Sequence, residues 1–176
     1  MKSILMPTDF SKNSVNAINY AMALFKDVSC EFYLLNVQKA SSFISDDMMV
    51  MASSATIYQT IIDVSKKSIA NLITKLETKY KNDKHTFHSV VDYDNFIDSI
   101  NQVTLNKKID LIVMGTKGAT GAKEVLFGSN TVHVFKSIKC AVLAIPQNFK
   151  FETPHEILFP TDYEIEFTKK QLQPLI

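Results

Sequence analysis

The four glycines of this chain are the residues whose type and spacing point most directly to chemistry. All of them fall between Gly115 and Gly128, although average glycine usage of about 7% would scatter roughly a dozen along a chain of this length. Glycine has no side chain, so it lets the backbone approach a bound group closely. The concentration of glycine in one segment indicates a loop that is shaped around a ligand. A tight turn with a close contact between helix and strand is the alternative explanation.

The residues on either side of this loop predict a strand before it and the start of a helix after it. The run Leu111–Met114 is apolar and rich in β-branched residues, which is typical of a strand buried on both faces. Ser129–Thr131 are residues that cap helices, and Val132 and Phe135 follow at helical spacing. Free N–H groups and the positive dipole end make a helix N-terminus a binding site for anions. The segment is therefore predicted to hold a phosphate group.

The glycine spacing differs from the common nucleotide motifs. Neither G-x4-G-K-[ST] nor G-x-G-x-x-G occurs, and the loop instead contains G-x2-G-x9-G-S, from Gly115 through Gly118 to Gly128 and Ser129. This spacing, after a strand that ends in Val-Met, resembles the ATP-binding branch of the universal stress protein family.

Apolar runs and helical periodicities alternate along the whole chain. Residues 39–54 are weakly periodic and are interpreted as a loose helical connector, with a flap near the ligand as the alternative. The alternation predicts an α/β fold with a doubly wound, five-stranded parallel sheet and helices on both faces. The predicted strands are 4–6, 30–37, 87–91, 109–114 and 141–145, and the predicted helices are 11–27, 57–81, 95–106 and 130–137.

The carboxyl ends of the first and fourth strands are expected to flank one crevice. In doubly wound sheets, ligands bind beyond the strand ends at the point where the strand order reverses. Residues 7–9 follow the first strand, and residues 114 and 115 end the fourth. A carboxylate at this position can accept hydrogen bonds from a ribose, so Asp9 is a candidate ligand residue. The alternative is that Asp9 or Ser11 caps the helix that follows.

The family resemblance extends over nearly the whole of residues 1–146, and residues 2–11, 34–37 and 110–118 carry it. It implies an adenine-nucleotide alpha-hydrolase-like fold and ATP as the ligand, with or without magnesium. It also implies that Asp9 contacts the ribose, that the main chain near Val37 meets the adenine, and that the glycine loop surrounds the phosphates. The implied binding residues are Pro7, Thr8, Asp9, Val37, Met114, Gly115, Lys117, Gly118, Gly128, Ser129, Asn130 and Thr131.

The residues favour a binding module over a dedicated enzyme. All nineteen basic residues are lysines, so no arginine can stabilise a transferred phosphoryl group from within the chain. Lys117, where many relatives have histidine or arginine, supplies charge with less directional bonding. We interpret the chain as an ATP-binding, universal stress protein-like module that acts in stress response as a nucleotide-dependent regulatory protein. A slow ATPase or phosphotransferase and a dimerisation module without ligand are the alternatives.

The composition limits the size of the domain, the kind of partner and the location that the chain is expected to have. A chain of 176 residues with 46% apolar content can build one domain with a substantial core, and a net charge of +1 does not indicate a nucleic-acid partner. Cys30 and Cys140 are expected to be buried and reduced. No apolar run is long enough to span a membrane and no signal sequence is recognised, so a cytoplasmic location is expected.

The C-terminal segment repeats the start of the chain. Residues 155–163 match residues 2–10 with Ile, Leu, Pro, Thr and Asp identical. We therefore expect a domain of residues 1–148, and in 149–176 a linker and the truncated start of a second copy, a strand with a partial helix. Such a remnant cannot bury a core alone and is expected to dock on the edge strand 141–145, within the chain or between two copies. The resemblance implies a homodimer through that strand.

Overall fold

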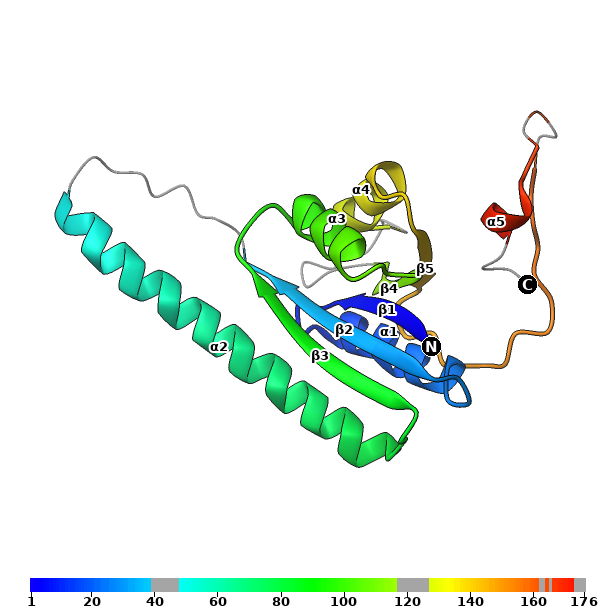
Figure 1. Cartoon of the computed structure of the whole chain (residues 1–176), viewed down its shortest axis with the longest axis horizontal. Coiled ribbons are helices and arrows are strands. Elements are labelled where there is room, and N and C mark those ends of the chain that lie inside the picture. Colours follow the sequence, from blue (N-terminus) through cyan, green and yellow to red (C-terminus); the bar gives the residue numbers. More distant parts are fainter. Residues whose placement is uncertain (39–47, 117–126, 162–163, 165, 173–176) are drawn as a thin grey trace.

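Strands and helices alternate along the chain, as Figure 1 shows. The computed structural model describes the backbone of residues 1–38, 48–116, 127–161, 164 and 166–172. The elements are, in chain order, β1 (Lys2–Pro7), α1 (Lys12–Leu24), β2 (Cys30–Val37), α2 (Met48–Tyr80), β3 (His85–Asp92), α3 (Phe96–Asn106), β4 (Leu111–Gly115), α4 (Ser129–Ser137), β5 (Ala141–Ile145) and α5 (Lys169–Leu172).

The five strands form one parallel sheet in the order β3-β2-β1-β4-β5. The chain builds outward from β1 to β3 and then returns to the other side of β1, so the order reverses between β1 and β4. These two strands pair only at Ile4–Leu111 and Leu5–Ile112, which leaves their C-terminal residues to separate. The predicted α/β, doubly wound architecture is confirmed, and its switch point lies between β1 and β4.

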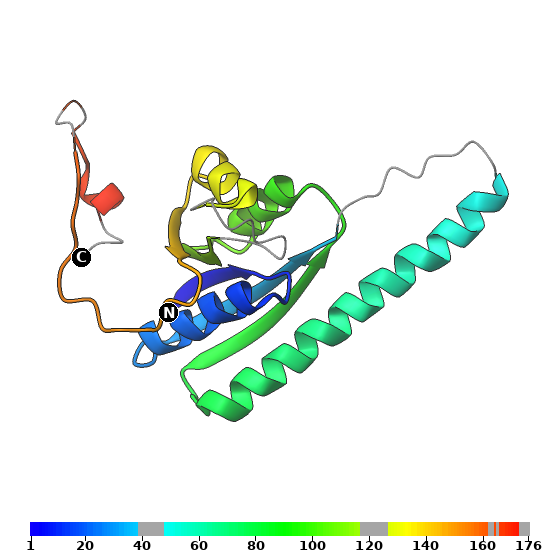
Figure 2. The same cartoon turned by 180° about the vertical axis from the view of Figure 1, so that it is seen from behind.

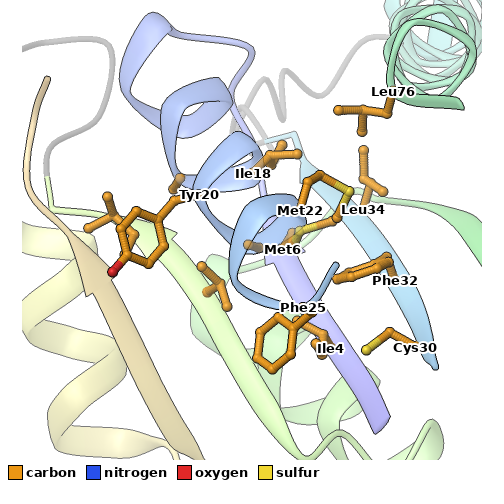
Figure 3. Close-up of a cluster of buried hydrophobic side chains, with 14 of the residues drawn as sticks. Ile4, Met6, Ile18, Tyr20, Met22, Phe25, Cys30, Phe32, Leu34 and Leu76 are labelled. Carbon is orange, nitrogen blue, oxygen red and sulfur yellow. The ribbon is translucent and has the colours of Figure 1, made fainter. Parts of the chain in front are cut away.

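The central strands β1, β2 and β4 are buried on both faces, which explains their uninterrupted apolar runs. Successive residues of a strand point to opposite faces. Ile4 and Met6 therefore belong to the cluster under α1 and α2, whereas Leu5 belongs to the cluster under α3 and α4; all three are fully buried. Figure 3 shows the first cluster, with side chains of α1 and Leu76 of α2 gathered over the sheet.

Capping side chains start two helices where the sequence predicts. The Ser11 hydroxyl accepts a hydrogen bond from the Ser14 N–H at 3.2 Å, and the Asn95 side chain accepts from the Ile97 N–H at 2.9 Å. Strand β3 is longer than predicted because it pairs with β2 along its whole length, from Cys30–His85 to Val37–Asp92. Pairing between strands, rather than local sequence, determines that boundary.

Helix α2 is longer than the predicted helix because it begins at Met48. The segment interpreted as a loose connector is therefore helical from Met48 onward, and its residues 39–47 lie outside the described residues. Figure 2 shows α2 running beside β3 and continuing past the sheet. Although α2 is 33 residues long, neither it nor any other described helix combines the length and apolar character needed to cross a membrane.

The segment after β5 packs against α1 and then leaves the domain. The rings of Phe149 and Phe151 lie 6.1 and 5.1 Å from the Tyr20 ring, and Asn16 Nδ2 donates to the Phe149 carbonyl at 3.0 Å. Beyond these contacts, residues 157–159 are exposed, Leu158 by 91%. Residues 152–161 contain neither strand nor helix, and no described tail residue pairs with β5. The strand expected there is not formed, because no neighbouring strand satisfies its backbone.

Candidate functional site

A cavity of about 180 Å³ lies at the carboxyl edge of the sheet, where β1 and β4 separate. Its walls come from the ends of β1, β2 and β4 and from the first residues of α3 and α4. The structure therefore places a cavity at the switch point, where ligands of doubly wound folds bind.

Ten of the twelve residues predicted from the sequence line this cavity together. Lys117 and Gly118 lie outside the described residues. Ser14 and Phe96 also line the cavity and were missed, since α1 and α3 bring them there from helix positions that carry no motif. The ten are Pro7, Thr8, Asp9, Val37, Met114, Gly115, Gly128, Ser129, Asn130 and Thr131.

The turn between β1 and α1 is held by hydrogen bonds to Thr8. Its N–H donates to the Leu35 carbonyl at 2.8 Å, and its hydroxyl pairs with the Ser14 hydroxyl at 3.0 Å. The same hydroxyl accepts from the Phe10 N–H at 3.0 Å. Phe10 has a φ of 61°, which is an unusual backbone conformation for a bulky residue. These contacts hold the intervening Asp9 at the cavity.

Asp9 does not cap α1, because Ser11 does so. Asp9 Oδ1 instead accepts from the Ser11 N–H at 3.0 Å, which is an Asx-turn that orients the carboxylate. Asp9 is exposed, and it is the one charged side chain among the described residues of the cavity wall. The carboxylate can accept further hydrogen bonds from a ligand hydroxyl.

The N-terminus of α4 forms the opposite wall and lacks a side-chain cap. Its N-cap residue is Gly128, whereas α1 and α3 are capped by Ser11 and Asn95. The first intrahelical bond runs from the Val132 N–H to the Gly128 carbonyl at 3.1 Å. The N–H groups of Ser129–Thr131 bond to no acceptor among the described residues, and all three residues line the cavity. This donor set, at the positive end of a helix dipole, suits an anion.

Gly115 packs closely against α1 and also lines the cavity. A Cβ atom there would lie 2.5 Å from Asn13 Nδ2 and 3.1 Å from the Asn13 carbonyl oxygen of α1. The close helix–strand contact, which the sequence left open as an alternative, therefore accounts for this glycine. Thr131 is 2% exposed, and its hydroxyl lies 3.2 Å from the carbonyls of both Gly115 and Thr116. That hydroxyl ties α4 to the end of β4.

The cavity wall has an apolar part and a polar part. Pro7, Val37, Phe96 and Met114 supply aliphatic and aromatic surface. Asp9, the hydroxyls of Thr8 and Ser14, and the start of α4 supply hydrogen-bonding groups. Such a wall suits a ligand with a flat apolar group, hydroxyls and an anionic end.

A sequence model of the Universal stress protein family matches residues 1–146 of this chain. The chain belongs to the universal stress protein family. Its relatives include Universal stress protein MJ0531 of Methanocaldococcus jannaschii, 28% identical over 144 residues that cover 82% of this chain and 81% of the relative.

Solved structures agree with this assignment. The structure of MJ0577, also from M. jannaschii, has a TM-score of 0.69 and 26% identity, and the match covers 84% of this chain and 96% of that protein. A family protein from Arabidopsis thaliana, solved with AMP bound, shares the fold at 14% identity and a TM-score of 0.54, covering 84% and 93% of the chains. A universal stress protein in complex with cAMP also shares the fold, at 18% identity and a TM-score of 0.55, and the match covers 82% of this chain and 96% of that protein.

Proposed function

We propose that this universal stress protein binds ATP in the cavity between β1, β4 and α4 and acts in stress response as a nucleotide-dependent regulatory protein. The observation that carries the proposal is the pairing, in one cavity, of an α4 N-terminus without a side-chain cap and the oriented carboxylate of Asp9. A nucleotide needs both features, one for its phosphates and one for its sugar. The AMP and cAMP complexes of the two distant family members support an adenine nucleotide.

The polar and apolar parts of the cavity wall indicate where the phosphates, the ribose and the base of the nucleotide lie in this proposal. The N–H groups of Ser129–Thr131 bind the phosphates, because they lie at a positive helix end and bond to no acceptor in the part of the chain that the structure describes. Asp9 accepts hydrogen bonds from the ribose, and the apolar surface near Val37 and Phe96 takes the base. These residues fit ATP by the chemistry of their donors and acceptors.

Calorimetric titration of the purified protein with ATP, AMP and GTP tests this proposal. We expect saturable binding of ATP and weaker binding of GTP, and we expect AMP to bind more weakly than ATP because it offers α4 fewer phosphates. Repeating the ATP titration with Mg²⁺ and with EDTA decides whether magnesium accompanies the nucleotide. A protein that shows neither heat nor a thermal shift with ATP would refute the assignment.

We further propose that the protein forms a homodimer through β5. This strand ends the sheet order and pairs only with β4 among the described residues, so its outer edge offers unpaired backbone. Residues Ala141–Ala144 are half-buried in the single chain, so a partner at this edge would cover more of them.

We also keep the proposal that residues 149–176 are a linker and the start of a second copy of the domain. The matched residues behave differently in the two places: 4–6 are fully buried in β1, whereas 157–159 are exposed. Apolar residues of an interior strand need neighbours on both faces, and the tail lacks them.

A further inference from the structure

Three side chains outside the cavity wall form a chain of hydrogen bonds that ends on the turn after β1. Asn36 Nδ2 donates to the Thr8 carbonyl at 2.7 Å. Gln38 Nε2 donates to Asn36 Oδ1 at 2.7 Å and to the Ser65 hydroxyl of α2 at 2.9 Å. Asn36 and Ser65 are each 3% exposed. The network therefore connects β2 and α2 to the backbone of Thr8, which itself lines the cavity.

The chemistry of these groups allows one assignment of donors and acceptors in the network. A backbone carbonyl can only accept, so Asn36 must turn its NH₂ group toward Thr8. Its carbonyl oxygen then faces Gln38, which must present its own NH₂ group, and the Ser65 oxygen accepts. Removing the Asn36 amide would leave the Thr8 carbonyl without this donor in a buried place, which is unfavourable.

The network acts on the part of the turn that carries Asp9. Phe10 holds a φ of 61°, and a bulky residue adopts such a conformation only when its surroundings hold it there. Those surroundings include the hydroxyl of Thr8, which accepts from the Phe10 N–H. Thr8 is held in turn by Leu35 on its N–H and by Asn36 on its carbonyl. The orientation of Asp9 between Thr8 and Phe10 therefore depends on these hydrogen bonds to Thr8.

We propose that Asn36, supported by Gln38 and Ser65, is a positioning residue that sets the ribose selectivity of the nucleotide site through Thr8 and Asp9. This inference rests on the proposed adenine-nucleotide site. Asn36 touches no ligand itself, and its effect passes through the backbone of the β1–α1 turn. The same network joins that turn to α2, whose Ser65 ends it.

The test compares Asn36→Leu, which keeps the size of the side chain and removes its donor and acceptor, with Asn19→Ala. Asn19 serves as a control because its amide also both donates and accepts: it donates to the Val15 carbonyl, accepts from Lys79 and Tyr80, and lies outside the cavity wall. Three properties are measured: affinity for ATP and for 2′-deoxy-ATP by calorimetry, amide exchange at Phe10 and Ser11 by NMR, and the free energy of unfolding.

We expect Asn36→Leu to bind ATP about tenfold more weakly, as for the loss of one buried hydrogen bond. Its affinities for ATP and 2′-deoxy-ATP should converge, and exchange at Phe10 and Ser11 should accelerate without ligand. Asn19→Ala should lose stability and keep the wild-type ratio of the two affinities. If Asn36→Leu does not fold, Gln38→Met should shift the same measurements in the same direction by less.

An unchanged ATP to 2′-deoxy-ATP ratio in a folded Asn36 or Gln38 variant would overturn the inference, as would unchanged exchange at Phe10. A shift of that ratio in Asn19→Ala as well would also overturn it, because general destabilisation would then explain the effect. If the wild-type protein binds no nucleotide, the proposed function is refuted instead. Faster exchange at Phe10 in Asn36→Leu would in that case still support a role of Asn36 in holding the turn after β1.

Discussion

Different features of the structure account for the glycines at positions 115 and 128. A side chain at Gly115 would meet Asn13 of α1, including its backbone, whereas Gly128 has φ −68° and ψ 157°, a conformation open to any residue. Packing therefore explains the first glycine. Backbone conformation does not explain the second, which leaves close approach of a ligand as its proposed reason.

Gly115→Ala is expected to destabilise the protein by about 1–3 kcal/mol, the usual effect of overpacking a tight contact. Adding Asn13→Ala should restore part of that loss, because it removes the side-chain clash and leaves only the backbone contact. Urea denaturation of the wild type, the single variants and the double variant measures both effects. Equal stability of Gly115→Ala and the wild type would contradict this reading of the contact.

Asp9→Ala is expected to weaken ATP binding by roughly 1.5–3 kcal/mol, the contribution of a charge-assisted hydrogen bond. Discrimination between ATP and 2′-deoxy-ATP should fall with it. The fold should persist, because Ser11, and not Asp9, caps α1. Competition between the two nucleotides in the wild type provides the check: equal affinities there would mean that Asp9 only shapes the turn.

At the scale of elements, α4 is distinguished by a glycine N-cap at a cavity wall. Two other helices that follow strands of the sheet, α1 and α3, are capped by the side chains of Ser11 and Asn95. A capping side chain occupies the N–H groups that an anion would use. The start of α4 therefore lacks the stability of a side-chain cap, and its first N–H groups bond to no acceptor among the residues that the structure describes.

Substitution at Gly128 tests whether the start of α4 binds the phosphates. Gly128→Ser should stabilise α4 by a few tenths of a kcal/mol and weaken ATP binding, because the new hydroxyl competes for the same N–H groups. Gly128→Val should abolish binding with little loss of fold, since its branched side chain would stand where the backbone meets phosphate. Calorimetry and thermal denaturation are measured on the same samples. Unchanged ATP affinity in both variants would exclude α4 as the phosphate site.

At the scale of the whole molecule, the thiols link stability to pH. Burial raises the pKa of the Cys30 and Cys140 thiols above their ordinary value of 9.0. The folded protein therefore keeps protons that the unfolded chain loses first. The stabilisation is present below pH 9.0 and is lost as the pH rises through the higher folded values.

The free energy of unfolding should thus decline above pH 9.0. A Cys30→Ala, Cys140→Ala double variant should decline less steeply, although its absolute stability is lower because the substitution of the buried Cys30 leaves space in a packed interior. Urea denaturation from pH 7 to pH 10.5 measures the slope. Parallel curves for the two proteins would contradict a role for the thiols.

The tail gives the molecule a second testable property. A chain that ends at Asn148 should bind ATP with wild-type affinity, because none of the described residues that line the cavity lies beyond that point. It should lose some stability, because Phe149 and Phe151 no longer cover Tyr20. Its dimer affinity should also change if the tail takes part in assembly. Sedimentation of both forms across concentration decides this, and identical profiles would exclude the tail from the dimer.

The sequence by itself determined the alternation of strands and helices, the approximate starts of α1 and α3, and the segments that meet at the cavity. These features follow from local periodicity, from turn chemistry and from the rule that parallel strands end at one edge. Only the tertiary structure decided the strand order, the full length of β3, the close contact of Gly115 with Asn13, and the hydrogen bond from Asn36 to the Thr8 carbonyl. Each of these depends on groups brought together from distant parts of the chain, and a single sequence carries no local signal of such a pair.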